Sequence, residues 1–301
     1  HETIKAHSKR TVDEYYLDLR NFFRFIKLEK GKLYIVATPI GNLDDITLRA
    51  INTLKEADII VAEDTRHSLK LLNHLGISKP LISYYRHTEE VKYEKILEKI
   101  KEGNNIALIS DAGTPIISDP GEVIVKEAIK ENIEVIPIPG ACAAITALMA
   151  AGVDTKKFVF YGFLSINKKL RKKELEEIQK ERKTIILYEA PHKLKNTLSD
   201  LNTYMPDRNV TIARELTKIH EEFVRGTAKE IYEKVQEPKG EYIIIIDSLP
   251  EPEEQENVLN ELTLEEHYKV YESQGMNKKE IIKQIAKDRN VNKNEIYMYF
   301  I

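Results

Sequence analysis

Residues 33–47 read LYIVATPIGNLDDIT, and this stretch carries the strongest fold signal in the chain. Five apolar residues come first, a proline and a glycine follow them, and a segment with helical periodicity covers residues 47–56. A short apolar run that ends at turn residues is typical of a buried strand. The stretch therefore predicts a strand, a rigid turn and a helix, which together begin an α/β fold.

The same alternation continues toward the C-terminus. We predict further buried strands over 58–62, 80–83, 105–110 and 134–138, and helices over 66–75, 88–102 and 120–131. Gly76 and Gly103 stand where helix ends favour a left-handed residue. These elements predict an N-terminal α/β domain over residues 32–154.

One uncharged stretch, from Val135 to Val153, approaches the length that crosses a bilayer. Two prolines and Gly140 interrupt its start, and most of the remainder is alanine. We therefore predict a strand, a tight turn and a buried helix there, and no association with a membrane.

A second set of elements predicts another α/β domain over residues 155–248. Its expected strands cover 157–164, 184–190, 209–213 and 241–247, and its expected helices cover 168–182, 191–203 and 227–236. Two prolines and many acidic residues predict a flexible linker over 249–262. Residues 263–301 predict a small helical module, for which a helix-turn-helix and a capping helical hairpin are equally good interpretations.

Residues 1–31 form a separate N-terminal extension. Thr11 and Glu14 are spaced as a capping box, and apolar residues follow at helical spacing. We expect one amphipathic helix whose apolar stripe is buried.

Composition narrows the functional classes. The 301 residues carry 46 Lys and Arg against 49 Asp and Glu, a net charge of −3, so any nucleic acid must be bound by local basic patches. Two candidates are lysine-rich; they are Lys168, Lys169, Arg171, Lys172, Lys173, Lys180, Arg182 and Lys183, and Lys278, Lys279, Lys283 and Lys287. A single cysteine, Cys142, excludes an intramolecular disulfide and fits a cytoplasmic protein. The N-terminus has no signal-peptide pattern.

Candidate ligand loops follow the predicted strands, because open α/β sheets bind ligands beyond the carboxyl ends of their strands. Small residues and prolines gather there in three runs, TPIG (38–41), SDAGTP (110–115) and PGA (139–141). Together they predict a rigid crevice lined by backbone, which suits a flat ligand of moderate size. The sequence has no G-x-G-x-x-G, P-loop or H-E-x-x-H motif, which argues against an ordinary dinucleotide enzyme, a P-loop ATPase and a zinc protease.

Charged residues also stand at strand ends, in the runs EDTR (63–66), YEAPH (188–192) and ARELTK (213–218). Removing carboxylates from water at the mouth of a crevice costs free energy unless they are paired with cations or take part in binding or catalysis. An ion-pair network that locks the two domains together is one explanation, and a functional site is the other.

These runs, taken in order with PGACAAITAL (139–148), resemble the tetrapyrrole-methylase superfamily over residues 32–301. Within it they look most like the bacterial methyltransferases that act on the ribose 2′-hydroxyl of a cytidine in small-subunit (16S) ribosomal RNA. The resemblance implies a two-domain α/β enzyme, a homodimer, that binds S-adenosylmethionine in the cleft between its domains and uses no metal. Two departures concern substrate contacts: Ser165 replaces a usual proline, and Thr88 follows His87 where relatives often have asparagine. Residues 1–31 lie outside the family and look like the first helix of a tyrosine recombinase.

Carried over by position, the resemblance places the cofactor against Pro39, Gly41, Asp111, Ala112, Gly113, Thr114, Pro115, Pro139, Gly140, Ala141, Tyr188, Ala213 and Gly240. Methyl transfer to a ribose hydroxyl needs an aligned acceptor oxygen and a group that takes its proton. The catalytic candidates, which the sequence does not rank, are Glu63, Asp64, Arg66, Glu189, Glu215 and Lys218. Two alternatives stay open: a methylase of a corrinoid or porphyrin precursor, and a non-catalytic nucleic-acid-binding regulator.

Overall fold

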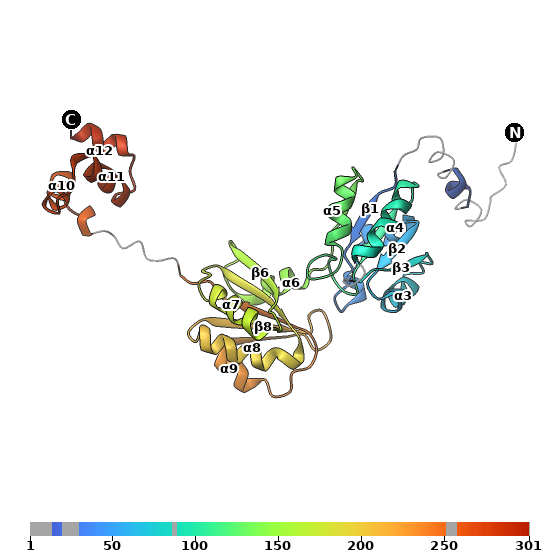
Figure 1. Cartoon of the computed structure of the whole chain (residues 1–301). Coiled ribbons are helices and arrows are strands. Elements are labelled where there is room, and N and C mark those ends of the chain that lie inside the picture. The colour runs from blue at the N-terminus through green and yellow to red at the C-terminus, as the bar shows by residue number, and fades with distance from the viewer. Residues whose placement is uncertain (1–13, 20–29, 86–88, 251–257, 301) are drawn as a thin grey trace, which may run out of the picture. The chain divides into compact units, whose positions relative to one another are not determined.

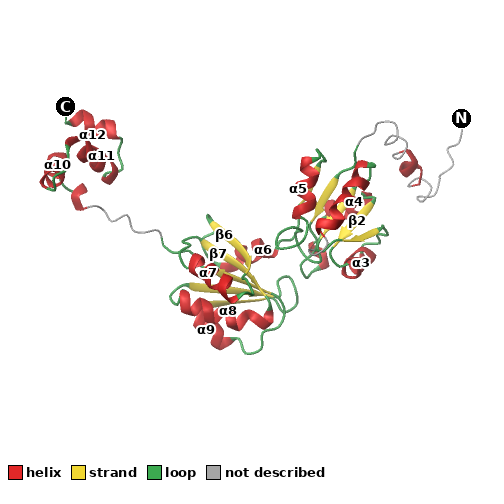
Figure 2. Ribbon diagram, viewed as in Figure 1, coloured by secondary structure: helices red, strands yellow, loops and turns green. Residues whose placement is uncertain are grey.

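The computed structural model describes residues 14–19, 30–85, 89–250 and 258–300 (Figure 1). The chain divides into two compact units, residues 1–248 and residues 249–301, and each is described by itself. The larger unit contains two five-stranded sheets, and the smaller one is helical (Figure 2). The α/β class predicted from the sequence is confirmed.

The first sheet is parallel throughout, with the order β3-β2-β4-β1-β5. Its strands are β1 (Leu33–Val36), β2 (Ile59–Ala62), β3 (Leu81–Ser83), β4 (Ile106–Ile109) and β5 (Val135–Ile138). The connecting elements are η1 (Leu43–Asp45), α2 (Leu48–Glu56), α3 (Thr65–His74), α4 (Glu89–Lys101) and α5 (Glu122–Lys130). All five strands lie where the sequence predicts them.

Helices cover both faces of this sheet because its strands β2 and β4 are apolar and buried at every position. Ile106 and Leu108 of β4 pack with α4 and α5, whereas Ala107 and Ile109 pack with α2 and α3. Successive side chains of a strand point to opposite faces, so an uninterrupted apolar run supplies both cores.

The second sheet is mixed, with the order β6-β7-β10-β8-β9. Its strands are β6 (Phe158–Phe163), β7 (Thr184–Glu189), β8 (Asn209–Arg214), β9 (Glu222–Thr227) and β10 (Tyr242–Ile246). β6 and β7 are parallel, and β10 runs antiparallel to both β7 and β8. One face is covered by α7 (Lys168–Ile178), α8 (Pro191–Tyr204) and α9 (Ala228–Lys234).

Strand β9 was not predicted. It pairs antiparallel with β8 at the edge of the sheet, and its residues are exposed or half-buried. An edge strand with a glycine and charged residues lacks the apolar run by which the other strands were recognised.

Helix α6 (Ala143–Ala151) follows β5 of the first sheet but packs on the second. Its Ala144, Ala147 and Ala151 lie against Ile186 and Ile245, in a cluster that also contains Ile40. Alanine side chains let a helix approach a sheet closely, so the predicted helix is found packed on a sheet, but it is buried on one face only, because Ile145 and Met149 are exposed. α6 joins the two sheets of the larger unit.

The smaller unit consists of η3 (Val258–Asn260), α10 (Leu264–Ser273), α11 (Lys278–Asp288) and α12 (Lys293–Tyr299) around a core of isoleucines. Capping boxes begin α10 at Thr263 and α11 at Asn277. The Asn260 amide donates to the backbone oxygen of Asp288 at 2.8 Å, so η3 belongs to this unit although the sequence placed it in the linker.

Residues 14–19 are helical, as the sequence predicts, but Thr11 and most of the expected apolar stripe lie outside the described residues. Tyr15 and Leu19 are 68% and 42% exposed, so the expected burial is wrong for these two side chains. Within the described ranges, no helix combines the length and the apolar character that a membrane span needs.

Candidate functional site

The carboxyl ends of β7 and β8 lie at one edge of the second sheet, where β10 begins. Tyr242, the first residue of β10, is paired with Glu189 on one side and Arg214 on the other. The loop after β4 of the first sheet also reaches this edge. Between them lies a cavity of about 360 Å³, which we call the acidic pocket.

Nineteen residues line the acidic pocket; they are Ile40, Asp111, Ala112, Gly113, Thr114, Ile117, Ser118, Asp119, Cys142, Ala143, Phe163, Tyr188, Glu189, Ala190, Pro191, Leu216, Glu241, Tyr242 and Ile243. Six of them are site residues predicted from the sequence: Asp111, Ala112, Gly113, Thr114, Tyr188 and Glu189. Four acidic residues, Asp111, Asp119, Glu189 and Glu241, are part of the lining, which contains no lysine, arginine or histidine. Such a pocket favours a cationic ligand and disfavours a phosphate.

Several other predicted cofactor residues support the lining rather than form it. Thr38 and Gly113 exchange two backbone hydrogen bonds, of 2.8 and 3.1 Å, beside Pro39. The Thr114 hydroxyl donates to the Ala141 oxygen at 2.9 Å, which ties the loop after β4 to the loop after β5. Pro39 borders a smaller cavity that shares Asp111 with the acidic pocket. Pro115, Pro139, Gly140 and Ala213 do not line the pocket, and Ala213 is fully buried in the sheet core.

Gly41 lies where the loop after β1 meets the loop after β8. A Cβ on Gly41 would stand 2.8 Å from the Thr217 hydroxyl oxygen and 2.5 Å from Lys218 Cγ, so no larger residue fits without displacement. The two loops therefore close one side of the cleft by direct contact.

Tyr188 fixes α6 to the second sheet. Its hydroxyl accepts a hydrogen bond of 3.2 Å from the backbone nitrogen of Ala144, and its ring makes edge contacts with Phe160 and Phe163. Burial raises the pKa of Tyr188 to about 12. The phenol therefore stays neutral, lines the pocket and holds α6 against the second sheet.

Glu189 is the predicted catalytic residue that lines the acidic pocket. Its side chain is 5% exposed; one carboxylate oxygen accepts from the Ala190 nitrogen at 2.9 Å, and the other accepts from the Thr197 hydroxyl. Both donors hold the carboxylate in one orientation.

Glu215 and Lys218 form a brace beside the pocket. Lys218 Nζ lies 3.0 Å from Glu215 and 3.2 Å from Glu241, and Glu215 also accepts from the Glu241 nitrogen. Burial opposes the charge of Glu215, but these hydrogen bonds outweigh it and lower the pKa of this carboxyl. Glu215 occupies the space that a Cβ on Gly240 would need, which explains the glycine there.

Asp64 and Arg66 form a second, local pair at the start of α3. Arg66 donates to both oxygens of the Asp64 carboxylate, and this side-chain hydrogen bonding is the main reason why the pKa of Asp64 falls to about 2. The Asp64 nitrogen donates to Asp111 at 3.0 Å, so the pair adjoins the pocket without lining it. Glu63 also lies outside the lining.

Two loops of the cleft contain residues with unusual backbone angles. Ile116 and Ser118 have φ of 77° and 67°, and Glu215 and Thr217 have φ of 50° and 65°. A left-handed conformation costs a β-branched residue on the order of 1–2 kcal/mol. Strain of this kind gathers at functional sites, and here it lies in two loops that border one cavity.

Several lining residues were not predicted. Ser118, Asp119, Ala190 and Pro191 continue the predicted loops, so their position in the chain is the signal that identifies them. Glu241, Tyr242 and Ile243 belong to a predicted strand but were not recognised as lining residues, because only the antiparallel direction of β10 brings its first residues to this edge.

A comparison with protein families now adds to this geometry. Residues 32–232 match the model of the tetrapyrrole (corrin/porphyrin) methylases. The chain belongs to this family. The match covers both sheets except β10, and so includes every loop that borders the pocket from the first sheet.

Several relatives that share one name have high sequence identity to this chain. "Ribosomal RNA small subunit methyltransferase I" of Halalkalibacterium halodurans is 51% identical, over 89% of this chain and 94% of its own length. The Bacillus subtilis protein of that name is 49% identical, over 90% of this chain and 94% of its own length. The Thermotoga maritima protein is 45% identical, over 72% of this chain and 98% of its own length.

Solved structures share the fold at low identity. Diphthine synthase has a TM-score of 0.57 at 14% identity, over 72% of this chain and 90% of its own. Uroporphyrin-III C-methyltransferase from Thermus thermophilus, solved with S-adenosylhomocysteine, has a TM-score of 0.53 at 17% identity. The match covers 71% of this chain and 97% of that chain.

Proposed function

We propose that this protein transfers a methyl group from S-adenosylmethionine to the ribose 2′-hydroxyl of a cytidine in small-subunit ribosomal RNA. The observation that carries the substrate class is the identity of about half with relatives named for that RNA, over nearly their whole length. The acidic pocket supports the choice of cofactor.

The residues present fit S-adenosylmethionine. This cofactor carries a sulfonium and an ammonium group, and four acidic residues and no basic residue line the pocket. Ile40, Ile117 and Leu216 supply apolar surface for the adenine and ribose. Gly113 has φ of +82°, and a Cβ there would lie 3.0 Å from Ile40 Cγ2, so a larger residue would strain the backbone and press on the pocket wall.

When bound, S-adenosylmethionine supplies a methyl group that its sulfonium charge makes electrophilic. The protein must then align the acceptor oxygen with that methyl group and remove the hydroxyl proton as the new bond forms. We assign the proton acceptor to Glu189, because it alone among the six catalytic candidates lines the pocket. Its two fixed hydrogen bonds hold the carboxylate in place for this role.

The remaining catalytic candidates take supporting roles in this proposal. Glu215 and Lys218 hold the loop after β8 against Gly41 and fix Glu241 at the pocket wall. Asp64, held by Arg66, orients Asp111 through its own backbone nitrogen at the N-cap of α3.

We further propose a cytoplasmic homodimer. Helix α6 leaves Ile145 42% and Met149 78% exposed on the side away from the sheet, a surface that a second copy could cover. A ribosomal substrate implies the cytoplasm. Exposed Lys278, Lys279 and Lys283 of α11 make the helical module a second RNA contact in this proposal.

Transfer of label distinguishes the three candidate functions. The protein is incubated with methyl-labelled S-adenosylmethionine and, in parallel, with small ribosomal subunits or a tetrapyrrole extract. Label in the RNA supports the proposal, label in a tetrapyrrole supports the corrinoid or porphyrin alternative, and no label in either supports a non-catalytic regulator.

A further inference from the structure

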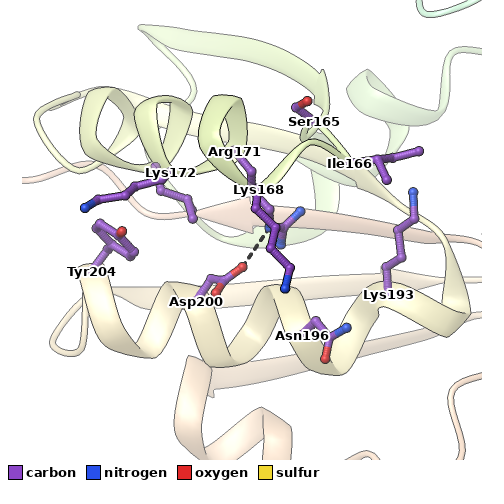
Figure 3. Close-up of a pocket in the computed structure, with 10 residues that line it drawn as sticks. Ser165, Ile166, Lys168, Arg171, Lys172, Lys193, Asn196, Asp200 and Tyr204 are labelled. Atoms are coloured by element: carbon purple, nitrogen blue, oxygen red, sulfur yellow. Dashed lines mark hydrogen bonds and ion pairs between the residues drawn. The ribbon is translucent and has the colours of Figure 1, made fainter.

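A second cavity, of about 420 Å³, lies between α7 and α8 (Figure 3). Ser165, Ile166, Lys168, Arg171, Lys172, Leu175, Lys193, Asn196, Asp200 and Tyr204 line it, and we call it the basic pocket. Figure 3 shows Lys168 reaching from α7 toward Asn196, and Lys193 standing up from α8 beside Ile166. Four cationic side chains face one carboxylate, a surplus of three positive charges in a chain whose net charge is −3.

The position of these lysines works against the stability of the helices. Lys168 and Lys193 lie in the first turns of α7 and α8, and neither first turn contains an acidic residue. The start of a helix already carries partial positive charge, so lysines there repel it unless an anion is bound. The arrangement is expected of an anion site rather than of a solvated face.

Arg171 is held rigidly at the floor of the pocket. Its Nε donates to Asp200 at 2.8 Å and its Nη2 donates to the Thr197 hydroxyl at 2.8 Å, and the side chain is 16% exposed. Lys168 and Lys193 have no ion pair among the described residues, whereas Lys172 lies 3.8 Å from Glu176. A fixed guanidinium beside two unpaired ammonium groups suits a phosphate.

The basic pocket adjoins the acidic pocket through α8. Pro191 lines the acidic pocket, and Lys193, two residues later, lines the basic one. The Thr197 hydroxyl accepts from Arg171 and donates to Glu189, which is part of the acidic lining. A nucleotide chain that enters the cofactor cleft thus finds its nearest strongly cationic site on the other side of the first turns of α8.

We propose that the basic pocket binds a phosphodiester of the substrate RNA next to the methylated nucleotide, with Lys168 and Lys193 as direct contacts and Arg171 as a rigid third cation. The inference rests on the proposed function. Four carboxylates make the acidic pocket repel the RNA backbone, so the protein needs this separate site to hold it.

The test compares the double variant K168Q/K193Q with the parent chain and with the control K229Q/K234Q, which removes two exposed lysines of α9 in the same sheet domain. Affinity for small-subunit ribosomal RNA is measured over a salt series, together with KM for RNA and calorimetric affinity for S-adenosylmethionine. We expect RNA affinity and KM to worsen about tenfold in K168Q/K193Q only. The slope of log K against log salt should flatten by about 0.7 for each phosphate that the variant no longer neutralises.

Three results would overturn the inference. Equal affinity, KM and salt slope in K168Q/K193Q and the control would show that RNA does not use the pocket, while methylation by the parent would keep the proposed function intact. Tight binding of inorganic phosphate that K168Q/K193Q abolishes, with RNA affinity unchanged, would show a small-anion site. Failure of the parent to bind or methylate the RNA would remove the proposed function and this inference together.

Discussion

Gly113 tests the cofactor assignment at the scale of a single residue. Replacement by valine places a side chain against Ile40 at the wall of the acidic pocket, so we expect Gly113→Val to abolish binding of S-adenosylmethionine in calorimetry. The far-ultraviolet circular dichroism should not change.

Gly76 is the matched control for this variant. It also has a left-handed φ, of 65°, but a Cβ there would meet no atom within 4 Å. Gly76→Val should therefore cost about 1 kcal/mol of stability and leave cofactor affinity unchanged. Unchanged affinity in Gly113→Val would place the cofactor elsewhere.

Glu189 tests the proposed proton acceptor. Glutamine keeps the size of the side chain but cannot take the proton, and loss of a general base costs about 100- to 10,000-fold in rate. We expect Glu189→Gln to lower kcat in this range while cofactor affinity changes by less than about threefold. Asp64→Asn, which alters a carboxylate outside the lining, should lower kcat far less. The reverse ranking would contradict the assignment.

The sequence predicted some residues of the site correctly and others wrongly, for a physical reason. Asp111 to Thr114 lie directly after a strand, where chain order alone locates a ligand loop. Ala213 was also expected to contact the cofactor, but it lies within β8 and its small side chain packs in the sheet core. Which of two neighbouring side chains faces the cavity depends on the twist and register of the sheet, which the sequence does not reveal.

At the scale of an element, the loop after β8 has a predictable response to pH. The pKa of Glu215 is lowered in the folded chain because Lys218 and the Glu241 nitrogen outweigh the effect of burial. A lowered carboxyl pKa stabilises the fold above its unfolded value of about 4.5, and this stabilisation disappears as pH falls through the folded pKa.

Glu215→Gln should therefore lose on the order of 1 kcal/mol of stability near pH 7 and less under acid conditions. Denaturant unfolding at pH 7 and below pH 4 measures the difference. Glu222→Gln serves as the control, because Glu222 is exposed and lies 3.4 Å from Arg214 in a looser pair. An equal loss of stability at both pH values would show that the charge of Glu215 does not stabilise the loop after β8.

Elements with continuous apolar runs were predictable, whereas an edge strand, and the choice of the sheet on which a helix packs, were not. β1, β2 and β4 are apolar on both faces, so their sequence alone identifies them. β9 exists because β8 offers it an edge, and α6 covers the second sheet although it follows a strand of the first. Both depend on long-range contacts that no local pattern encodes.

At the scale of the whole molecule, residues 1–31 should be dispensable for catalysis. They lie outside the match to the methylase family, and the Thermotoga maritima relative is matched over 98% of its length by 72% of this chain. A chain that starts at Lys32 should fold and methylate like the parent. Loss of activity at full cofactor affinity would instead give the extension a role in binding the substrate.

The position of the transferred methyl group decides whether this protein methylates the ribose of a cytidine. Small ribosomal subunits that lack the modification are incubated with the protein and S-adenosylmethionine, and their RNA is digested to nucleosides for mass spectrometry. We expect new 2′-O-methylcytidine from the parent chain and none from Glu189→Gln. A methyl group on a base, or on no nucleoside while a tetrapyrrole accepts it, would contradict the proposed function.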